Sequence, residues 1–124
     1  MGMLIKEHDQ YPESILVRNF VDSVDFDEIL SSWEHLVTSE LITPDIKGII
    51  NDLSGCELNL DLENFAILTD FLKKQDKLRL IRLAVIADSP DKMIFPMLGD
   101  LKLKEFEIQP FSSMEPATRW LLNR

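Results

Sequence analysis

Hydrophobic and polar positions along this chain alternate between two periods, which predict strands and amphipathic helices in turn. Continuous apolar runs or a period of two predict five strands, at Met3–Glu7, Ser14–Phe20, Ile46–Leu53, Leu80–Ala87 and Lys104–Gln109. The turn-rich residues HDQYPE separate the first two strands, and that spacing permits an antiparallel hairpin. After the third strand, the polar residues of Asn51–Gly55 predict a break before the next helix.

Apolar residues three and four positions apart predict four helices between these strands. The first begins near Phe26, where Asp25 and Glu28 form a capping-box pattern. The second covers about Asp61–Lys74 and has more apolar surface than one sheet contact needs. A third, short helix follows Ser89–Pro90 and reaches about residue 98, and the last begins after Ser112–Ser113.

The element order is therefore ββαβαβαβα, which predicts the α/β class. Strand–helix–strand units of this kind imply right-handed crossovers and a mostly parallel sheet covered by helices. The length of 124 residues suits one domain over residues 1–124, with a core that needs neither a disulfide nor a metal.

Composition restricts the partners that this chain can be expected to bind. Acidic residues outnumber basic ones 22 to 13, for a net charge of -9, so nucleic acid is not an expected partner and membrane contact should be peripheral at most. A single cysteine, Cys56, excludes an intramolecular disulfide. The sequence has no signal-peptide pattern and no apolar run of membrane-spanning length, which predicts a cytoplasmic protein.

Short polar residues near the ends of two predicted strands form the first candidate site. Asp52, Ser54 and Gly55 follow one strand, and Asp88 and Ser89 follow the next. In parallel sheets such residues share one rim, where ligands commonly bind. The alternative is that they only form the turns and helix caps that strand ends require.

No residue set in the sequence amounts to a catalytic or metal site. Ser54 lacks the surrounding G-x-S-x-G elbow, and neither His8 nor His35 has a clear claim to be its base. The two histidines are too few and too separated to nominate a metal site. We therefore predict a protein that is not an enzyme and that needs no cofactor.

Surplus apolar side chains on the second and third helices form the second candidate site. Two groups would line a cleft: Phe65, Leu68 and Leu72 from the second helix, and Met93, Phe95 and Met97 from the third. The third helix could be a lid, a dimer contact or a membrane-touching element, or could be buried in the core. Ile67 and Phe71 are the candidate partner face of the second helix.

The stretch around the third strand resembles the STAS domain, named for sulfate transporters and anti-sigma-factor antagonists. Asp52-Leu53-Ser54-Gly55 matches that family's Asp-Leu-Ser element. Its D-S-[ST]-G phosphorylation motif would fall on Asp61-Leu62-Glu63-Asn64, which keeps only the aspartate, so the phosphoserine switch should be absent. The closing segment, Val85–Leu122, is similar to the SpoIIAA-like (STAS/Sec14-like) branch.

For that branch the resemblance implies a non-enzymatic module associated with an apolar ligand or a membrane. Our preferred hypothesis is a STAS-like binding module with an apolar ligand or lipid in the cleft between the second and third helices. The alternative is a protein-interaction or homodimerisation module in bacterial regulation, docking through the second helix.

Overall fold

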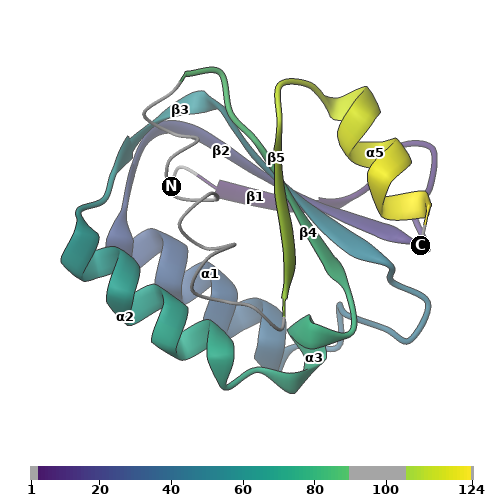
Figure 1. Cartoon of the computed structure of the whole chain (residues 1–124), viewed down its shortest axis with the longest axis horizontal. Coiled ribbons are helices and arrows are strands. Elements are labelled where there is room, and N and C mark those ends of the chain that lie inside the picture. The colour runs from purple at the N-terminus through teal and green to yellow at the C-terminus, as the bar shows by residue number, and fades with distance from the viewer. Residues whose placement is uncertain (1–2, 90–105, 124) are drawn as a thin grey trace.

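A computed structural model describes residues 3–89 and 106–123 and arranges them as one sheet with helices on both faces (Figure 1). The strands are β1 (Met3–Glu7), β2 (Ile15–Asp25), β3 (Gly48–Asn59), β4 (Arg82–Ile86) and β5 (Glu107–Phe111). The helices are α1 (Phe26–Thr38), α2 (Leu62–Lys73), α3 (Asp76–Arg79) and α5 (Met114–Leu122). In Figure 1, α1, α2 and α3 lie on one side of the sheet and α5 on the other.

The sheet topology confirms the expected α/β class. The strand order is β1-β2-β3-β4-β5, with β1 antiparallel to β2 and every other pair parallel. The first pair is the hairpin that the turn-rich spacing permits, with Met3 opposite Phe20. The order of strands in space is thus the order along the chain.

The first helix starts at the cap that the sequence predicts, and the second has an aspartate cap at its predicted start. The Asp25 carboxylate accepts a hydrogen bond of 3.0 Å from the Glu28 amide at the start of α1. Asp61 accepts one of 2.7 Å from the Asn64 amide and so caps α2. These bonds satisfy amide groups that a helix leaves without partners in its first turn.

The predicted break at Asn51–Gly55 is wrong, because β3 continues through it to Asn59. β2 is also longer than predicted and stays paired with β3 as far as Asp25, after a register shift between Asn19 and Val21. Apolar Cys56 and Leu58 face the core beyond the polar residues, so continued pairing buries them. The short α3 was not predicted, and the expected helix over about residues 90–98 lies outside the described residues.

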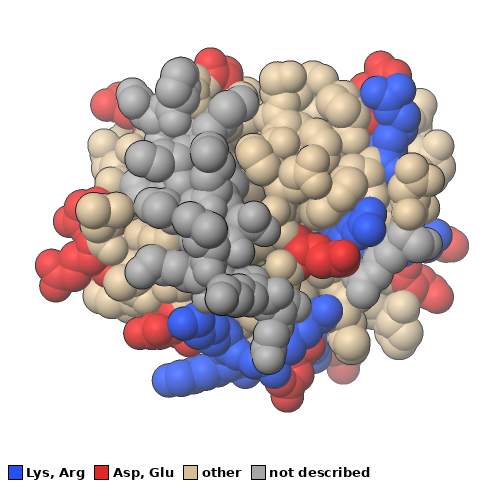
Figure 2. All heavy atoms as spheres, viewed as in Figure 1, with Lys and Arg blue, Asp and Glu red and all other residues tan. Residues whose placement is uncertain are grey.

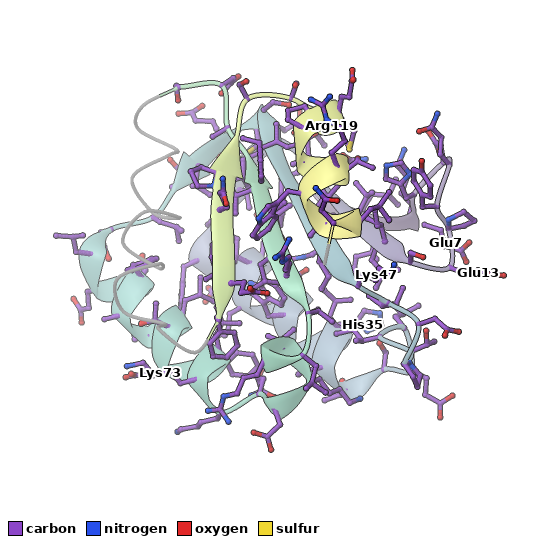
Figure 3. The ribbon with its side chains drawn as sticks, turned by 45° about the vertical axis from the view of Figure 1, so that its right-hand side comes forward. Glu7, Glu13, His35, Lys47, Lys73 and Arg119 are labelled. Atoms are coloured by element: carbon purple, nitrogen blue, oxygen red, sulfur yellow. The ribbon has the colours of Figure 1, made fainter. Side chains whose placement is uncertain are left out.

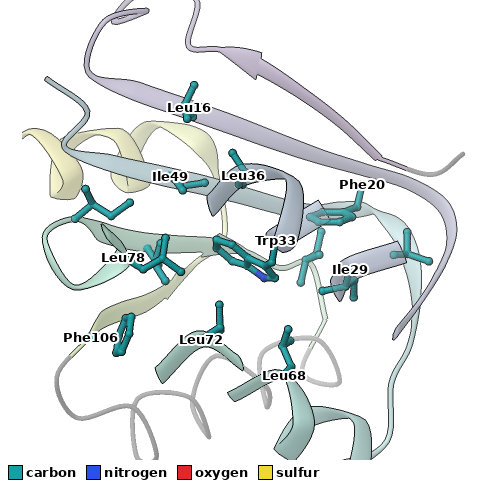
Figure 4. Packing of buried hydrophobic residues seen from close by; sticks show 14 of the residues in the cluster. Leu16, Phe20, Ile29, Trp33, Leu36, Ile49, Leu68, Leu72, Leu78 and Phe106 are labelled. Carbon is teal, nitrogen blue, oxygen red and sulfur yellow. The ribbon is translucent and has the colours of Figure 1, made fainter. Parts of the chain in front are cut away.

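Adjacent residues of the parallel strands supply two separate cores, one on each face of the sheet. Ile49 belongs to the cluster under α1 and α2, whereas its neighbour Ile50 packs against α5. Figure 4 shows the larger cluster, with Trp33 of α1 between the sheet and α2. Burial on both faces explains why these strands have continuous apolar runs instead of a clean alternation.

His8 links the end of β1 to α5. Its Nδ1 accepts hydrogen bonds from the amides of Gln10 (3.0 Å) and Tyr11 (3.3 Å). Since Nδ1 accepts, the proton of the neutral ring is on Nε2, which donates to Thr118 Oγ1 at 3.0 Å. Burial lowers the pKa of His8, an effect that nearby Asp9 opposes and Lys6 reinforces.

We expect protonation of His8 to destabilise the fold. The unfolded chain binds this proton at the ordinary histidine pKa of 6.5, and the folded chain binds it only at lower pH. The free energy of unfolding should therefore fall as pH drops below that value, and the loss should level off below the folded-state pKa. Urea unfolding of the native chain and of His8→Asn between about pH 5 and pH 7 measures how much of the pH dependence of the free energy of unfolding comes from His8. An equal pH slope in both proteins would exclude His8 as the cause.

Candidate functional site

A cavity of about 110 Å³ lies on the face of the sheet that α1 and α2 cover, and it is lined from these two helices and four strands. We call it the helix-side cavity. Its described lining consists of Arg18, Phe20, Ile29, Trp33, Asn51, Leu53, Leu58, Leu60, Phe65, Leu68, Thr69, Leu72, Leu83, Val85 and Ile108. Only the arginine, the asparagine and the threonine among these residues are polar, so the cavity combines apolar walls with few polar groups.

The second helix contributes the apolar residues that the sequence assigns to a cleft. Phe65, Leu68 and Leu72 are buried and line the helix-side cavity. Figure 4 shows Leu68 and Leu72 projecting from α2 toward Trp33. The other candidate wall, Met93, Phe95 and Met97, lies outside the described residues.

Arg18 brings a buried cation to the helix-side cavity. It lies in the middle of β2 and is 1% exposed. Its guanidinium carbon lies 4.0 Å from the ring centroid of Trp33 and 4.9 Å from that of Phe20, so the planar cation is stacked against two aromatic faces. Burial lowers the pKa of Arg18 to about 9, which leaves the group charged at neutral pH.

Neutral oxygen atoms hold this guanidinium in place. Nη1 donates to Asn51 Oδ1 at 2.6 Å, while Nε and Nη2 donate to Ser32 Oγ at 3.1 and 2.8 Å. The Asn51 amide nitrogen donates to the Ala84 carbonyl at 3.0 Å, which turns its oxygen toward the arginine. Arg18 and Asn51 are opposite each other in the parallel register of β2 and β3, so the sheet itself sets this contact.

Arg18 and Asn51 were not predicted from the sequence as site residues, although the alternation of residues along β2 and β3 indicates that both face the core. Alternation along β2 places Arg18 on the same face as Leu16 and Phe20, which are buried. The same alternation places Asn51 between Ile49 and Leu53 in β3. A polar residue at a core-facing position in two adjacent strands indicates a buried polar pair.

Three of the predicted rim residues gather elsewhere, in a depression along the edge of the sheet. Asp52, Ser54 and Gly55 lie in β3 and line this depression of about 460 Å³ together with β1 and β2. Its Leu4 and Val21 are 61% and 47% exposed, so a ligand there would remain in contact with water. Ser54 donates to Asp52 Oδ1 through both its amide (3.0 Å) and its hydroxyl (2.6 Å).

The remaining predicted positions lie apart from the helix-side cavity. Asp88 and Ser89 follow β4 and are not among the described residues that line either hollow. On α2, Ile67 is 47% exposed, whereas Phe71 is partly buried against the larger core. The apolar surface of α2 therefore divides between a buried stripe along the cavity and exposed side chains that include Ile67 and, at the start of the helix, Leu62.

Nucleophiles, histidines and charges elsewhere in the described residues form no second site. No group of three His, Cys, Asp or Glu side chains there has metal-binding geometry. Cys56 is buried, and its thiol lies 3.3 Å from the Leu53 carbonyl oxygen.

Figure 3 shows His35 at the outside of α1, and Arg119 projects from α5 on the other side of the sheet from Lys73. In Figure 2, described charges on the visible face lie mainly toward its edges, with both signs close together.

Within residues 3–89 and 106–123, none of the helices is long and apolar enough to cross a membrane.

Comparison with known proteins identifies the fold. No family model and no curated protein matches this chain. A solved structure does match over nearly the whole length: an uncharacterised protein of the DUF3478 family from Shewanella loihica PV-4, which has a SpoIIAA-like fold. The two chains are 17% identical and superpose with a TM-score of 0.61 over 97% of this chain and 92% of the other. At this identity the likeness extends to the fold alone. It confirms the architecture that the STAS resemblance implies, and the chain has a SpoIIAA-like fold.

Proposed function

We propose that this protein is a non-catalytic module that binds an apolar small molecule in the helix-side cavity. The observation that carries this proposal is the cavity itself, whose described lining is apolar except for Arg18, Asn51 and Thr69. Transfer of apolar surface from water into such a cavity is favourable and roughly proportional to the area buried. The Thr69 hydroxyl already donates to the Ala66 carbonyl at 2.9 Å, so it makes little demand on a ligand.

The polar groups of the cavity support binding rather than catalysis. Arg18 cannot accept a proton while it is charged, so it cannot act as a base. Asn51 is a neutral amide fixed by two hydrogen bonds. The one serine of the STAS-like element, Ser54, lies in the edge depression with its hydroxyl bound to Asp52. The phosphorylation motif of the STAS family keeps only its aspartate here, at the cap of α2.

Filling the helix-side cavity should abolish binding. Val85 lies on the floor of the cavity in β4, and Val85→Phe would put a ring into the space a ligand needs. The probe is 1-octanol, titrated against tryptophan emission in a Trp120→Phe background, so that Trp33 is the only remaining tryptophan. We expect at least about tenfold weaker octanol binding in Val85→Phe.

The matched control is Ile67→Phe, which makes a similar enlargement at an exposed position of α2. Binding should be unchanged in that variant, because its side chain is not part of the described cavity lining. Equal octanol affinity in Val85→Phe and the native chain would contradict the proposed site. Unfolding curves of both variants establish that each is folded at the temperature of the titration.

A second candidate function is protein interaction or homodimerisation through α2. The exposure of Ile67 and the partial exposure of Phe71, one turn apart on the same helix face, favour it. Native mass spectrometry of gently purified protein separates the two candidates. A small-molecule adduct on a single chain supports ligand binding. A mass of twice the chain that is lost in Ile67→Glu supports docking.

A further inference from the structure

We propose that the occupant of the helix-side cavity is an apolar monocarboxylic acid whose carboxylate binds Arg18. This inference rests on the proposed binding function and specifies the ligand's chemical class. Its basis is a cation that is 1% exposed, lines the cavity, and has no carboxylate partner among the described residues.

The hydrogen bonds of Arg18 leave part of its donor capacity unused. A guanidinium has five N–H groups in a planar fork. Three of them are directed at Ser32 Oγ and Asn51 Oδ1, both neutral oxygens, in the described structure. The charge therefore has dipoles and aromatic faces around it but no counter-ion there. A carboxylate that enters the cavity could accept the remaining N–H groups in the geometry that the fork favours.

Two other arginines in the described structure also lie near aromatic rings, and each of them has a carboxylate partner. Arg82 lies 4.8 Å from the Trp120 ring and pairs with the Glu107 carboxylate at 3.2 Å. Arg79 lies 5.8 Å from the Phe106 ring and pairs with Asp76 at 2.8 Å. Arg18 is the most buried of the three, and it alone lacks an acidic partner among the described residues.

Burial and fixed hydrogen bonds make Arg18 a prepared anion site. The guanidinium loses its water when the chain folds. The free-energy cost of its desolvation is therefore not part of the free energy of binding a carboxylate. Fixed hydrogen bonds to β3 and α1 also remove most of its side-chain freedom before binding. Both effects strengthen an ion pair that forms only when the ligand arrives.

The rest of the cavity defines the remainder of the ligand. A single cation suits a single negative charge, and apolar side chains from α1, α2 and the sheet suit a hydrocarbon chain. A volume of about 110 Å³ holds about four groups the size of a water molecule, so a longer chain must extend through the open side of the cavity. An eight-carbon acid is a suitable probe because its carboxylate end can enter while the rest of its chain covers the apolar opening.

The test compares sodium octanoate with 1-octanol, two probes of equal chain length that differ in charge. Both are titrated at neutral pH and constant ionic strength against Trp33 emission in the Trp120→Phe background. We expect octanoate to bind the native cavity at least about tenfold more tightly than octanol. Arg18→Met should reduce that preference to about one while octanol still binds.

Two further variants keep the result interpretable. Arg18→Met/Asn51→Leu removes the cation together with its acceptor, and it provides a second folded background if Arg18→Met alone unfolds. Arg82→Met removes another stacked arginine, on the opposite face of the sheet, and should leave the octanoate preference intact. Octanol binding without a preference for octanoate would overturn the carboxylate inference and leave the proposed function standing. A preference that survives the loss of Arg18 would also overturn it. Failure of both probes to bind would overturn the inference and the proposed function together.

Discussion

Replacing Asn51 with leucine should lower the free energy of unfolding by about 3 kcal/mol, although the two side chains have similar size. Asn51 is 6% exposed, and its oxygen accepts the 2.6 Å hydrogen bond from Arg18. Leucine would leave that part of a buried cation facing hydrocarbon. Removal of one partner from a buried charge is costly because water does not replace it.

The cost should depend on the cation. In an Arg18→Met background, Asn51→Leu should cost less than about 1 kcal/mol, since the charge that required the amide is absent. Urea unfolding of the native chain, both single variants and the double variant gives the coupling directly. Additive losses would show that Asn51 acts through some other contact, such as its bond to the Ala84 carbonyl.

Thr69→Val is the matched control for this cycle. Thr69 is 3% exposed and lines the same cavity, but its hydroxyl bonds to the Ala66 carbonyl of its own helix. Its replacement should have the same effect with or without Arg18. If the losses came instead from a general change in the polarity of the cavity, the effects of both Asn51→Leu and Thr69→Val would depend on Arg18.

These expectations connect stability with function at one residue. A buried charge held by neutral hydrogen-bond partners is weak evidence for stability, because well-packed apolar residues often replace buried charged networks without loss. If Arg18 served only the fold, the paired substitution Arg18→Met/Asn51→Leu would have no functional consequence. The proposed carboxylate site gives the arginine a role that an apolar replacement cannot perform.

The sequence predicted the sheet well because its strongest signals are local. The capping box at Asp25 marks the start of α1, and apolar runs such as LIRLAVIA need burial on both faces of a sheet. The end of β3 was mispredicted because short polar residues at positions 51–55 have the composition of a turn. Continued pairing of β3 with β2 is a tertiary effect that composition does not encode.

The candidate site was predicted in part. Phe65, Leu68 and Leu72 were found because a helix with surplus apolar surface must bury it. Arg18 was missed because arginine is rarely buried, which outweighs its place in the alternation of β2. Only the register of β2 against β3 shows that Asn51 lies opposite and supplies the acceptor.

A second large effect is expected where α5 crosses the sheet. Gly48→Ala should lower the free energy of unfolding by about 3 kcal/mol. A Cβ at Gly48 would collide with the Leu121 side chain and would lie 2.7 Å from the Arg82 carbonyl oxygen. Leu121 is fully buried in the smaller core, and the carbonyl belongs to the adjacent strand β4, so neither has room to move.

Gly55→Ala in the same strand separates this steric effect from glycine's general flexibility. Neither glycine has a positive φ, so alanine fits the backbone at both positions. A Cβ at Gly55 would meet the Phe20 carbonyl oxygen at 3.6 Å, an ordinary contact. That substitution should change stability by less than about 1 kcal/mol. Equal losses in the two variants by urea unfolding would mean that strand β3 needs glycine for its backbone rather than for the approach of α5. A loss of stability in Gly48→Ala but not in Gly55→Ala would indicate a steric clash. If Leu121→Ala reduced that loss only in part, the remaining clash would be with the Arg82 carbonyl oxygen, which the hydrogen-bonded sheet holds in place.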